Sequence, residues 1–308
     1  MSEAVAGRPS RAARRYQLAR RVTIALSCAV VAGLPLLHLV ALGAESGTRW
    51  AWLREVLPLQ APPAIGAPWS VRILGVELLD PLALVGLLAA RKVELGIVLA
   101  ALPTIALVAL LGRFFCGWLC PYLPILAVSN AVRGVLERLG LKPRNAPIPA
   151  RIGVLVLVAL LAATAIGGAQ LAPLFYPPSV IGREVFRAIF FGSFGGGALF
   201  IALAFTFDTF VSRAGFCRSV CPGGVVFRLL AVRSPIAVER TASRCTDCGI
   251  CDAVCNLGQS PMTDRLDSGC ERCGRCAAAC PTDALQIRAR VPGRGSLVIL
   301  DQDRRPSA

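Results

Sequence analysis

Eight of the thirteen cysteines in this 308-residue chain lie close together near its C-terminal end. They form two sets, in each of which the cysteines are separated by two, two and three residues, and a proline follows the second set. The members are Cys245, Cys248, Cys251 and Cys255 in the first set and Cys270, Cys273, Cys276 and Cys280 in the second. This spacing is typical of bacterial proteins that hold two [4Fe–4S] clusters, in which the fourth cysteine of each set ligates the other cluster.

The spacing therefore predicts two clusters and assigns their ligands. Three closely spaced thiolates can wrap one cluster as the chain turns, and the fourth leads towards the partner cluster. The predicted ligands are Cys245, Cys248, Cys251 and Cys280 for the first cluster and Cys270, Cys273, Cys276 and Cys255 for the second. Disulfides are disfavoured on the reducing cytoplasmic side, and a zinc site would use two CxxC pairs. Asn256 stands where a proline often follows the fourth cysteine, so the spacing does not define the local turn.

Four more cysteines occur in two copies of a CxxxCP motif, CGWLCP at residues 116–121 and CRSVCP at residues 217–222. A spacing of four places both sulfurs of a motif on one side of a helical turn, and the following proline favours the end of that turn. The candidate ligands are Cys116, Cys120, Cys217 and Cys221. They could form a third metal centre, a redox dithiol pair or a copper(I) site, which prefers soft sulfur, or they could be buried apolar residues. Cys28, alone in an apolar run, is interpreted as a packing residue.

The elements that must position these cysteines are predicted to be membrane helices. The chain is 55% hydrophobic, with a mean hydropathy of +0.64, and only 17% of its residues are charged, whereas soluble domains carry about 25%. Four runs, 22–42, 93–111, 152–171 and 190–211, approach the roughly 20 apolar residues that a membrane crossing needs. We predict a mostly α-helical, polytopic membrane protein with four transmembrane helices, followed by a small α+β ferredoxin-like domain with two clusters.

The distribution of arginine predicts the orientation and the domains. Positive residues concentrate before the first run, between the second and third runs, and after the fourth, which places both termini and the clusters in the cytoplasm. Arg91 and Lys92 are exceptions, because this topology puts them outside. The net charge of +15 is therefore assigned to loops rather than to nucleic-acid binding. The expected parts are a basic N-terminus (1–21), the membrane domain (22–240), the cluster domain (241–290) and a tail (291–308).

Two segments of the predicted membrane domain each allow more than one interpretation. Arg14 and Arg15 resemble a twin-arginine export signal, but the following apolar run is longer than the core of a signal peptide, so we expect an uncleaved first span. Residues 78–90 form an apolar run that is too short to cross. Its length suits a re-entrant or interfacial segment, or alternatively an amphipathic helix on the outer surface.

The composition also excludes several cofactors. His38 is the one histidine, so two histidine ligands for a b-type haem are absent, and no C-x-x-C-H motif for a c-type haem occurs. No glycine-rich nucleotide or flavin motif occurs either. By elimination, we expect a lipid-soluble electron donor, with quinol as the candidate. Ionisable residues near membrane interfaces are often functional, and the weak candidates for a quinol site are His38, Glu77, Asp80, Tyr176 and Asp208. The alternatives are packing for His38 and a helix cap for Asp80.

Taken together, the four apolar runs, the motifs CGWLCP and CRSVCP and the C-terminal cysteine sets resemble the NapH family of membrane ferredoxin-type proteins, with its MauN relatives. Leu79-Asp80-Pro81-Leu82 also looks like a segment of that family. The resemblance implies a quinol dehydrogenase component of the bacterial cytoplasmic membrane. Such a component passes electrons towards a periplasmic reductase or dehydrogenase system, with ferredoxin-type or c-type cytochrome subunits as partners. Because the clusters are predicted inside, either a partner must bridge the membrane or electrons must enter from the inner side.

The CxxxCP motif is shared with NosR-type and CcoG-type proteins, which leaves a second class of function open. In that alternative the protein is a copper-handling or redox-enzyme maturation factor, and the CxxxCP thiols bind or reduce copper while the clusters supply electrons. A third alternative is a non-catalytic membrane anchor for a redox complex. That anchor would not need the eight C-terminal cysteines.

Overall fold

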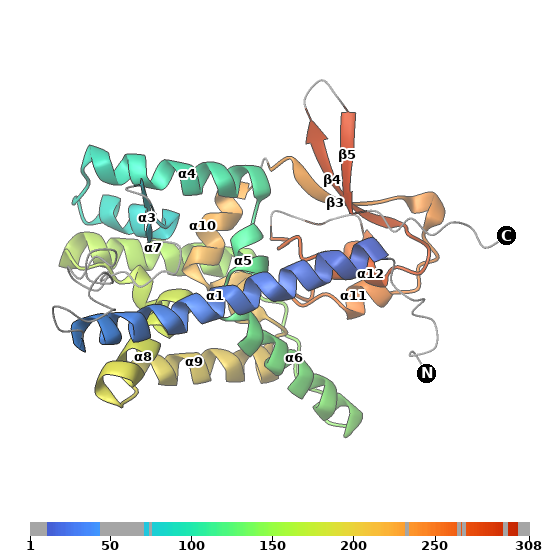
Figure 1. The fold of residues 1–308 in the computed structure, drawn as a ribbon. Helices are drawn as coiled ribbons and strands as arrows, with labels where there is room; N and C mark the ends of the chain where they lie inside the picture. The colour runs from blue at the N-terminus through green and yellow to red at the C-terminus, as the bar shows by residue number, and fades with distance from the viewer. Residues whose placement is uncertain are drawn as a thin grey trace.

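A computed structural model describes residues 11–43, 71–73, 76–231, 234–263, 266, 269–291 and 295–300. The described chain is mostly helical, as predicted. The long helices α1 (Arg11–Gly43), α4 (Leu95–Leu111), α7 (Ala150–Gly167) and α9 (Gly196–Thr206) run in roughly the same direction (Figure 1). A smaller module with β-strands lies at one end of this bundle. The two parts correspond to the apolar and the cysteine-rich parts of the sequence.

The bundle helices are apolar on the outside as well as the inside. By length and composition, α7 is the one helix of the described residues that is long and apolar enough to cross a membrane, and only 17% of its apolar window is buried within the protein. α4 and residues 196–211 form shorter apolar helices. Large apolar side chains point outwards, including Ile166, which is 90% exposed, and Leu95, which is 75% exposed. An apolar surface of this kind is unusual on a soluble monomer and marks an interaction surface or a membrane contact.

Residues 190–211 were predicted to form one membrane helix, but they do not, and the predicted start of that helix is wrong. Its first two residues belong to α8 (Pro177–Phe191), which ends at Gly192 in the left-handed conformation (φ +61°). Glycine adopts this conformation without a steric penalty and commonly ends helices. Helix α9 then begins at Gly196 and continues as the π-helical turn η2 (Phe207–Val211). The glycine-rich stretch between the two aromatic segments therefore divides the run.

The short apolar run at 78–90 lies inside the bundle rather than on its surface. The hairpin of β1 (Val71–Ile73) and β2 (Val76–Leu78) precedes α3 (Pro81–Ala89). Asp80 caps α3, since its Oδ1 accepts a hydrogen bond from the amide of Leu82 at 2.7 Å. The side chains of Leu82, Ala83 and Leu84 are buried where α3 packs against α4, α7 and α10 (Pro222–Leu230). An amphipathic surface helix is thus not what these residues form.

Two short elements carry the first cysteine of each CxxxCP motif, namely α5 (Phe114–Trp118) and the π-helical turn η3 (Phe216–Val220). Helix α6 (Leu123–Arg138) follows the first motif, and η1 (Ala172–Phe175) lies between α7 and α8. Helix α5 follows α4 directly, and η3 follows η2 after a brief turn. Each motif therefore begins where a bundle helix ends, at the end of the bundle that faces the module.

The module is a three-stranded antiparallel sheet with two short helices. Its strands are β3 (Ile236–Arg240), β4 (Leu285–Val291) and β5 (Gly295–Leu300), in the order β3-β4-β5. The register pairs Ile236 with Ala289, and the β4–β5 ladder has an irregularity between Ile287 and Arg288. The helical segments are η5 (Ala242–Arg244), α11 (Ile250–Ala253), η6 (Pro261–Thr263) and α12 (Arg275–Ala279). The outer strands thus come from sequence on both sides of the cysteine sets.

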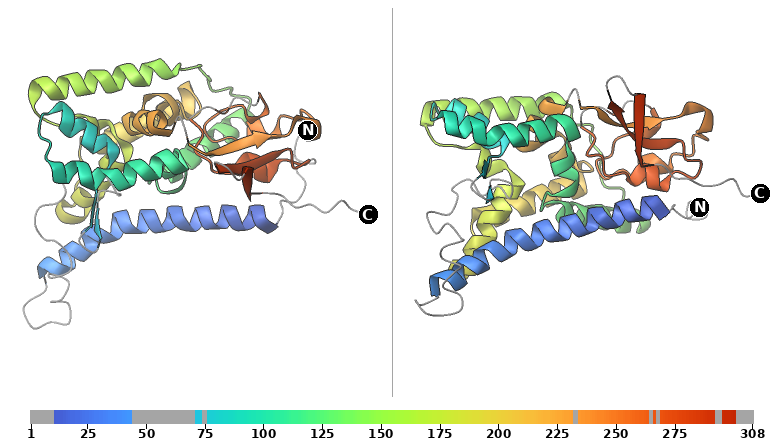
Figure 2. Two further views of the ribbon diagram at one scale, coloured as in Figure 1. Left: turned by 90° about the horizontal axis from the view of Figure 1, so that it is seen from above. Right: turned by 45° about the horizontal axis from the view of Figure 1, so that its top comes forward.

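The N-terminal turns of α1 join the module to the bundle. They lie beside the module in both views of Figure 2, and Ala13 is completely buried in the module core together with Cys276 and Ile287. A second core fills the bundle around Tyr122, Phe227 and the CxxxCP cysteines. One continuous helix therefore contacts both parts of the molecule.

The burial of α3 leads to a stability prediction. Replacing Leu82 by alanine removes a side chain that is 1% exposed and leaves a cavity, so we expect a loss of about 2–5 kcal/mol and a lower Tm in detergent. Leu88 lies on the same helix but is 54% exposed, so Leu88→Ala is the matched control and should change stability by less than about 0.5 kcal/mol. Equal losses from the two variants would contradict the buried position of α3.

Candidate metal centres

The predicted ligands of the first cluster line a single cavity. Cys245, Cys248, Cys251 and Cys280 line this cavity together with Arg240, Met262, Pro281 and Leu285. Three of these cysteines precede or begin α11, and the fourth follows α12. The chain therefore brings the first set and the last cysteine of the second set to one place, which is the ligand set that the spacing predicts.

The two cysteine sets are built on the same backbone conformation. Asp247 and Arg272 occupy equivalent places and have φ values of +50° and +52°, and Gly249 and Gly274 follow with +71° and +70°. Such left-handed residues are uncommon outside glycine, so their repetition at matching positions shows two copies of one turn. Each turn passes from the second cysteine of its set into a short helix that carries the third.

The predicted ligands of the second cluster are buried close to one another. Burial raises the pKa of the Cys270 thiol to about 11, although the Arg272 guanidinium lowers it. Burial also raises the pKa of Cys276, and the neighbouring charges of Cys270 and Cys255 raise it further. Thiols in such a place do not ionise in neutral solution unless a metal replaces the proton. The surroundings therefore favour a bound metal group over free thiolates.

No three His, Cys, Asp or Glu side chains among the described residues lie close enough to hold a single metal ion. A four-iron cluster asks for a different arrangement, since each cysteine binds a different iron at a corner of the cluster. Four cysteines spread around one cavity meet that requirement.

A second cavity lies where the bundle meets the module, and all four CxxxCP cysteines line it. Tyr122, Tyr176, Arg113 and Glu271 also line this cavity. We call it the four-thiol cavity, defined by Cys116, Cys120, Cys217 and Cys221. The two motifs are far apart in sequence, but the fold brings α5 and the turn η3 to the wall of the same cavity.

The local fold fixes each thiol of the four-thiol cavity. Cys116 lies on α5 and Cys217 on η3, while Cys221 caps α10 and is followed by Pro222 at its first position. The amides of Gly223 and Gly224 hydrogen-bond the Cys221 sulfur, yet burial raises the pKa of this thiol to about 12. A side chain at residue 224 would come within 2.9 Å of the Arg113 guanidinium. Glycine is needed there because the two groups approach so closely.

Two residues in the wall of the four-thiol cavity have buried polar atoms without a hydrogen-bond partner among the described residues. Nε of Arg113 and Oε1 of Glu271 are buried and have no hydrogen-bond partner among the described residues. Oε1 of Glu271 lies 3.6 Å from the Arg20 guanidinium, which pairs with it electrostatically. Four soft sulfurs, a cavity and an unused buried donor fit an iron–sulfur cluster, and copper(I) is the other metal that such sulfurs suit.

Side chains of both motifs and of α1 hold the module against this cavity. From α1, Tyr16 donates to the Arg272 carbonyl and Gln17 donates to the Cys273 carbonyl, each at 2.8 Å. From the second motif, Arg218 donates to the carbonyl of Gly258 at 3.1 Å. Leu257 and Glu271, which follow Cys255 and Cys270 closely, line the four-thiol cavity themselves. The loops that carry Cys255 and Cys270 are therefore the part of the module nearest to this cavity.

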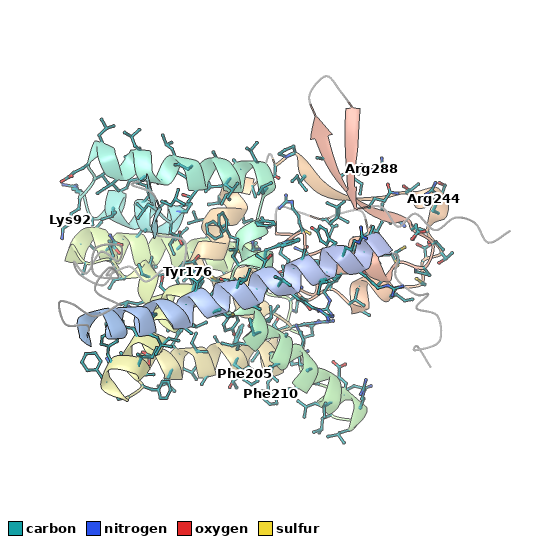
Figure 3. All side chains as sticks on the ribbon, in the orientation of Figure 1. Lys92, Tyr176, Phe205, Phe210, Arg244 and Arg288 are labelled. Carbon is teal, nitrogen blue, oxygen red and sulfur yellow. The ribbon has the colours of Figure 1, made fainter. Side chains whose placement is uncertain are left out.

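The candidates for a quinol site are placed differently. Tyr176 lines the four-thiol cavity and lies in the interior of the bundle in Figure 3. Asp80 is the cap of α3 described above, which confirms the structural alternative for that residue. His38 lies on α1 and Glu77 on β2, but their side chains are outside the described residues.

Asp208 is fully buried and organises the second motif. Its Oδ2 accepts a hydrogen bond from the Tyr122 hydroxyl at 3.1 Å, and its Oδ1 accepts one from the amide of Phe216 at 2.8 Å. Phe216 is the residue before Cys217. These contacts give Asp208 a structural role in the turn that carries Cys217, beside α6.

Sequence reasoning missed Arg113, Glu271 and Tyr122 as parts of the site. Arg113 belongs to the positive residues between the second and third apolar runs, which are predicted to lie in a cytoplasmic loop. Its side chain is nevertheless only 2% exposed. A signal was present, since Arg113 stands between an apolar run and a cysteine motif, and Glu271 stands directly beside a predicted ligand. Which far segments these side chains meet depends on the fold alone.

Comparisons with known proteins agree with these donor sets. A family profile described as a 4Fe-4S binding domain matches residues 94–138 and again residues 194–237, so each match holds one bundle helix and one CxxxCP motif. A second profile with the same description matches residues 267–286, which contain the second cysteine set. No solved structure matches the chain.

Several bacterial proteins are related to this chain. The ferredoxin-type protein NapH of Escherichia coli (strain K12) is 34% identical over 179 residues, which are 56% of this chain and 59% of that protein. The methylamine utilization ferredoxin-type protein MauN of Methylorubrum extorquens is 30% identical over 224 residues, which are 67% of this chain and 75% of that protein. The NapH protein of Haemophilus influenzae is 29% identical over 66% of its length.

A helical bundle whose CxxxCP motifs match a 4Fe-4S binding profile, joined to a module whose second cysteine set matches another, defines an iron–sulfur protein of the ferredoxin type that serves electron transport. The similarity extends over both parts of the chain. The chain belongs to the family of NapH and MauN ferredoxin-type proteins.

The contacts of Asp208 separate its structural role from a role with quinol. Asp208→Ala leaves the Tyr122 hydroxyl and the Phe216 amide without their buried acceptor, so we expect a loss of about 1–3 kcal/mol and a lower Tm. Asp208→Asn keeps an acceptor oxygen and should lose less. Iron content and quinol reactivity of the folded fraction should remain. A variant that folds with the wild-type Tm but no longer reacts with quinol would contradict the structural role.

Proposed function

We propose that this protein is a membrane electron-transfer protein of the bacterial cytoplasmic membrane and a component of quinol oxidation. The observation that carries this proposal is the position of the four-thiol cavity, between an apolar bundle and a module with two further cysteine sets. A lipid-soluble donor reaches the bundle, whereas a protein acceptor reaches the module. The site between them has the thiols that a redox centre needs.

In this proposal the bundle crosses the membrane four times, with α1, α4, α7 and the α9–η2 segment as the spans. Their outward apolar side chains support this, because such surfaces are stable in lipid and costly in water. Lys92 lies at one end of the bundle, while Arg244 and Arg288 lie on the module at the other end (Figure 3). The concentration of arginine at the module end supports a cytoplasmic module.

The proposed ligands are Cys245, Cys248, Cys251 and Cys280 for one [4Fe–4S] cluster, Cys270, Cys273, Cys276 and Cys255 for the second, and Cys116, Cys120, Cys217 and Cys221 for a third centre. Each such cluster supplies one-electron redox chemistry when it is bound. The chain itself excludes water, because the four-thiol cavity is enclosed by buried residues such as Tyr122 and Phe227. The α1 contacts of Tyr16 and Gln17 keep the second set at a fixed distance from this cavity.

Oxidation of quinol gives quinone, two protons and two electrons, so one-electron centres must take the electrons singly. We place the quinol on the Tyr176 side of the four-thiol cavity, because Tyr176 is the predicted candidate that lines this cavity among the described residues. The electrons leave to other redox subunits, ferredoxin-type proteins or c-type cytochromes. Since one relative is named only as a ferredoxin-type protein and another for methylamine utilization, the terminal acceptor is left to such a partner.

The proposal is tested by the reduction of purified, anaerobic protein with quinol. We expect about twelve iron atoms per chain, four for each of three centres, and an EPR signal of reduced clusters that quinol produces. The double variant Cys116→Ala with Cys217→Ala should contain about eight iron atoms and lose quinol reduction, while dithionite still reduces the module clusters. The matched control is Cys28→Ala, which removes a cysteine outside all three sets and should keep every iron.

Two results would overturn parts of this proposal. If dithionite reduces the clusters of the wild-type protein and quinol never does, the protein does not oxidise quinol. If the wild-type protein contains about eight iron atoms and the four-thiol cavity binds copper that the double variant loses, the protein is a copper-handling factor. The matches of both CxxxCP motifs to a 4Fe-4S binding profile favour iron.

The proposed topology is tested with the two lysines of the chain. Lys92 and Lys142 are both exposed and lie in loops on opposite sides of the proposed membrane. A membrane-impermeant amine reagent should label Lys92 in right-side-out vesicles and Lys142 in inverted vesicles, as read by mass spectrometry of peptides. Labelling of both lysines from the same side would contradict four crossings.

A further inference from the structure

The side chain of Arg113 contacts three separate cysteine-bearing segments of the protein. Its Nη1 donates to the carbonyl of Gly269 at 3.0 Å, and its Nη2 donates to the carbonyl of Cys217 at 3.2 Å and to the Cys116 sulfur at 3.9 Å. Gly269 directly precedes Cys270. One guanidinium therefore links the first motif, the second motif and the loop of the second cysteine set.

The burial of Arg113 is unusual for a charged side chain. It is 2% exposed and lines the four-thiol cavity, and no carboxylate forms a salt bridge with it within the described residues. A buried charge is costly unless an opposite charge compensates it. Its hydrogen bonds to two carbonyls satisfy Nη1 and Nη2, but they do not neutralise the charge. The group that does so must be anionic and must lie in the cavity.

A third observation shows where such a group meets Arg113. The Nε–H of Arg113 is buried and has no hydrogen-bond partner in the described chain. Gly224 leaves room for the guanidinium at the cavity wall, since a side chain there would approach Nη2 to 2.9 Å. Four cysteine thiolates around an iron–sulfur cluster make an anionic group with sulfur acceptors. Such a group would use the unpaired Nε–H and balance the buried charge.

We propose that Arg113 is a residue of the third centre, where it donates its Nε–H to the metal–thiolate group in the four-thiol cavity and stabilises the reduced, more negative state of that group. This inference rests on the proposed third centre but not on quinol as its donor. It assigns to Arg113 a control of redox potential as well as the attachment of the module. Loss of the positive charge makes the addition of an electron less favourable, so the potential becomes more negative.

The test is a redox titration with mediators and EPR detection on the full-length holoprotein. The signal of the third centre is identified as the one that Cys116→Ala with Cys217→Ala removes. In Arg113→Gln, which is neutral but polar, we expect the ratio of reduced to oxidised third centre at a fixed potential to fall about tenfold, which corresponds to 59 mV for a one-electron couple. In Arg113→Lys, which retains the charge, the ratio of reduced to oxidised third centre should fall less than about threefold. The midpoint potentials of the other two clusters should shift less than that of the third centre.

Arg133 supplies the matched control. It is also a buried arginine, 5% exposed, and it donates to the carbonyl of Thr209 at 2.7 Å, but it does not line the four-thiol cavity. Arg133→Gln should lower stability without moving the potential of the third centre. The inference is overturned if Arg113→Gln titrates like the wild type, if Arg113→Lys shifts as much as Arg113→Gln, or if Arg133→Gln produces the same shift.

A measurement on the wild-type protein keeps the test valid if Arg113→Gln does not fold. Protein labelled with ¹⁵N-arginine should show a weak ¹⁵N coupling on the EPR signal of the third centre in pulsed experiments, because the Nε–H donates to it. Absence of this coupling overturns the inference. About eight iron atoms in the wild type would overturn the third centre and the inference together, whereas failure of quinol to reduce the protein would leave the inference standing.

Discussion

The arrangement of this protein depends on one constraint: two short turns from distant parts of the chain must bring their four thiols to one place. Each turn begins where an apolar helix ends, so the length and packing of the bundle set the position of the sulfurs. Buried polar contacts then fix the turns, with Asp208 holding the residue before Cys217 and Arg113 joining the first turn to the second. Because a buried donor or acceptor that loses its partner costs free energy, these contacts specify one arrangement.

The attachment of the module follows from the same constraint. The two CxxxCP turns contact different loops of the module, the first meeting Gly269 through Arg113 and the second meeting Gly258 through Arg218. These loops adjoin Cys270 and Cys255, which come from different cysteine sets but are assigned to the same cluster. The two CxxxCP turns thus contact the module at two loops, and both loops adjoin ligands of the same predicted cluster. Movement of the module away from the bundle would disturb that site before it disturbed the other.

The sequence predicted those features that depend on local patterns. Cysteine spacing placed Cys280 with the first set, and the structure has all four thiols at one cavity, since the turns that carry them are short and local. Apolar runs predicted a helical bundle for the same reason. The spacing also indicated that the CxxxCP sulfurs share a helical turn, although the second turn is π-helical.

Features that depend on distant contacts could not be predicted in this way. The contact between Arg113 and Gly269 joins residues that lie 156 positions apart, and the sequence around Arg113 does not show which distant segment its side chain meets. The burial of α3 depends on α7 and α10, which follow it in the chain. The end of α8 at Gly192 could not be predicted from the number of apolar residues, because that number does not depend on the backbone conformation of a single residue.

One difference among the eight module cysteines has a consequence for how the protein tolerates air. Cys248 is the exposed member of this group, while Cys251, Cys276 and Cys280 are buried and the others are partly covered. Oxidants attack accessible sulfur first, so damage begins at the corner of the site that Cys248 occupies. Under the proposed cluster assignment, the centre at the surface is then the first to lose iron during aerobic handling, and the centre in the four-thiol cavity, between bundle and module, is the last.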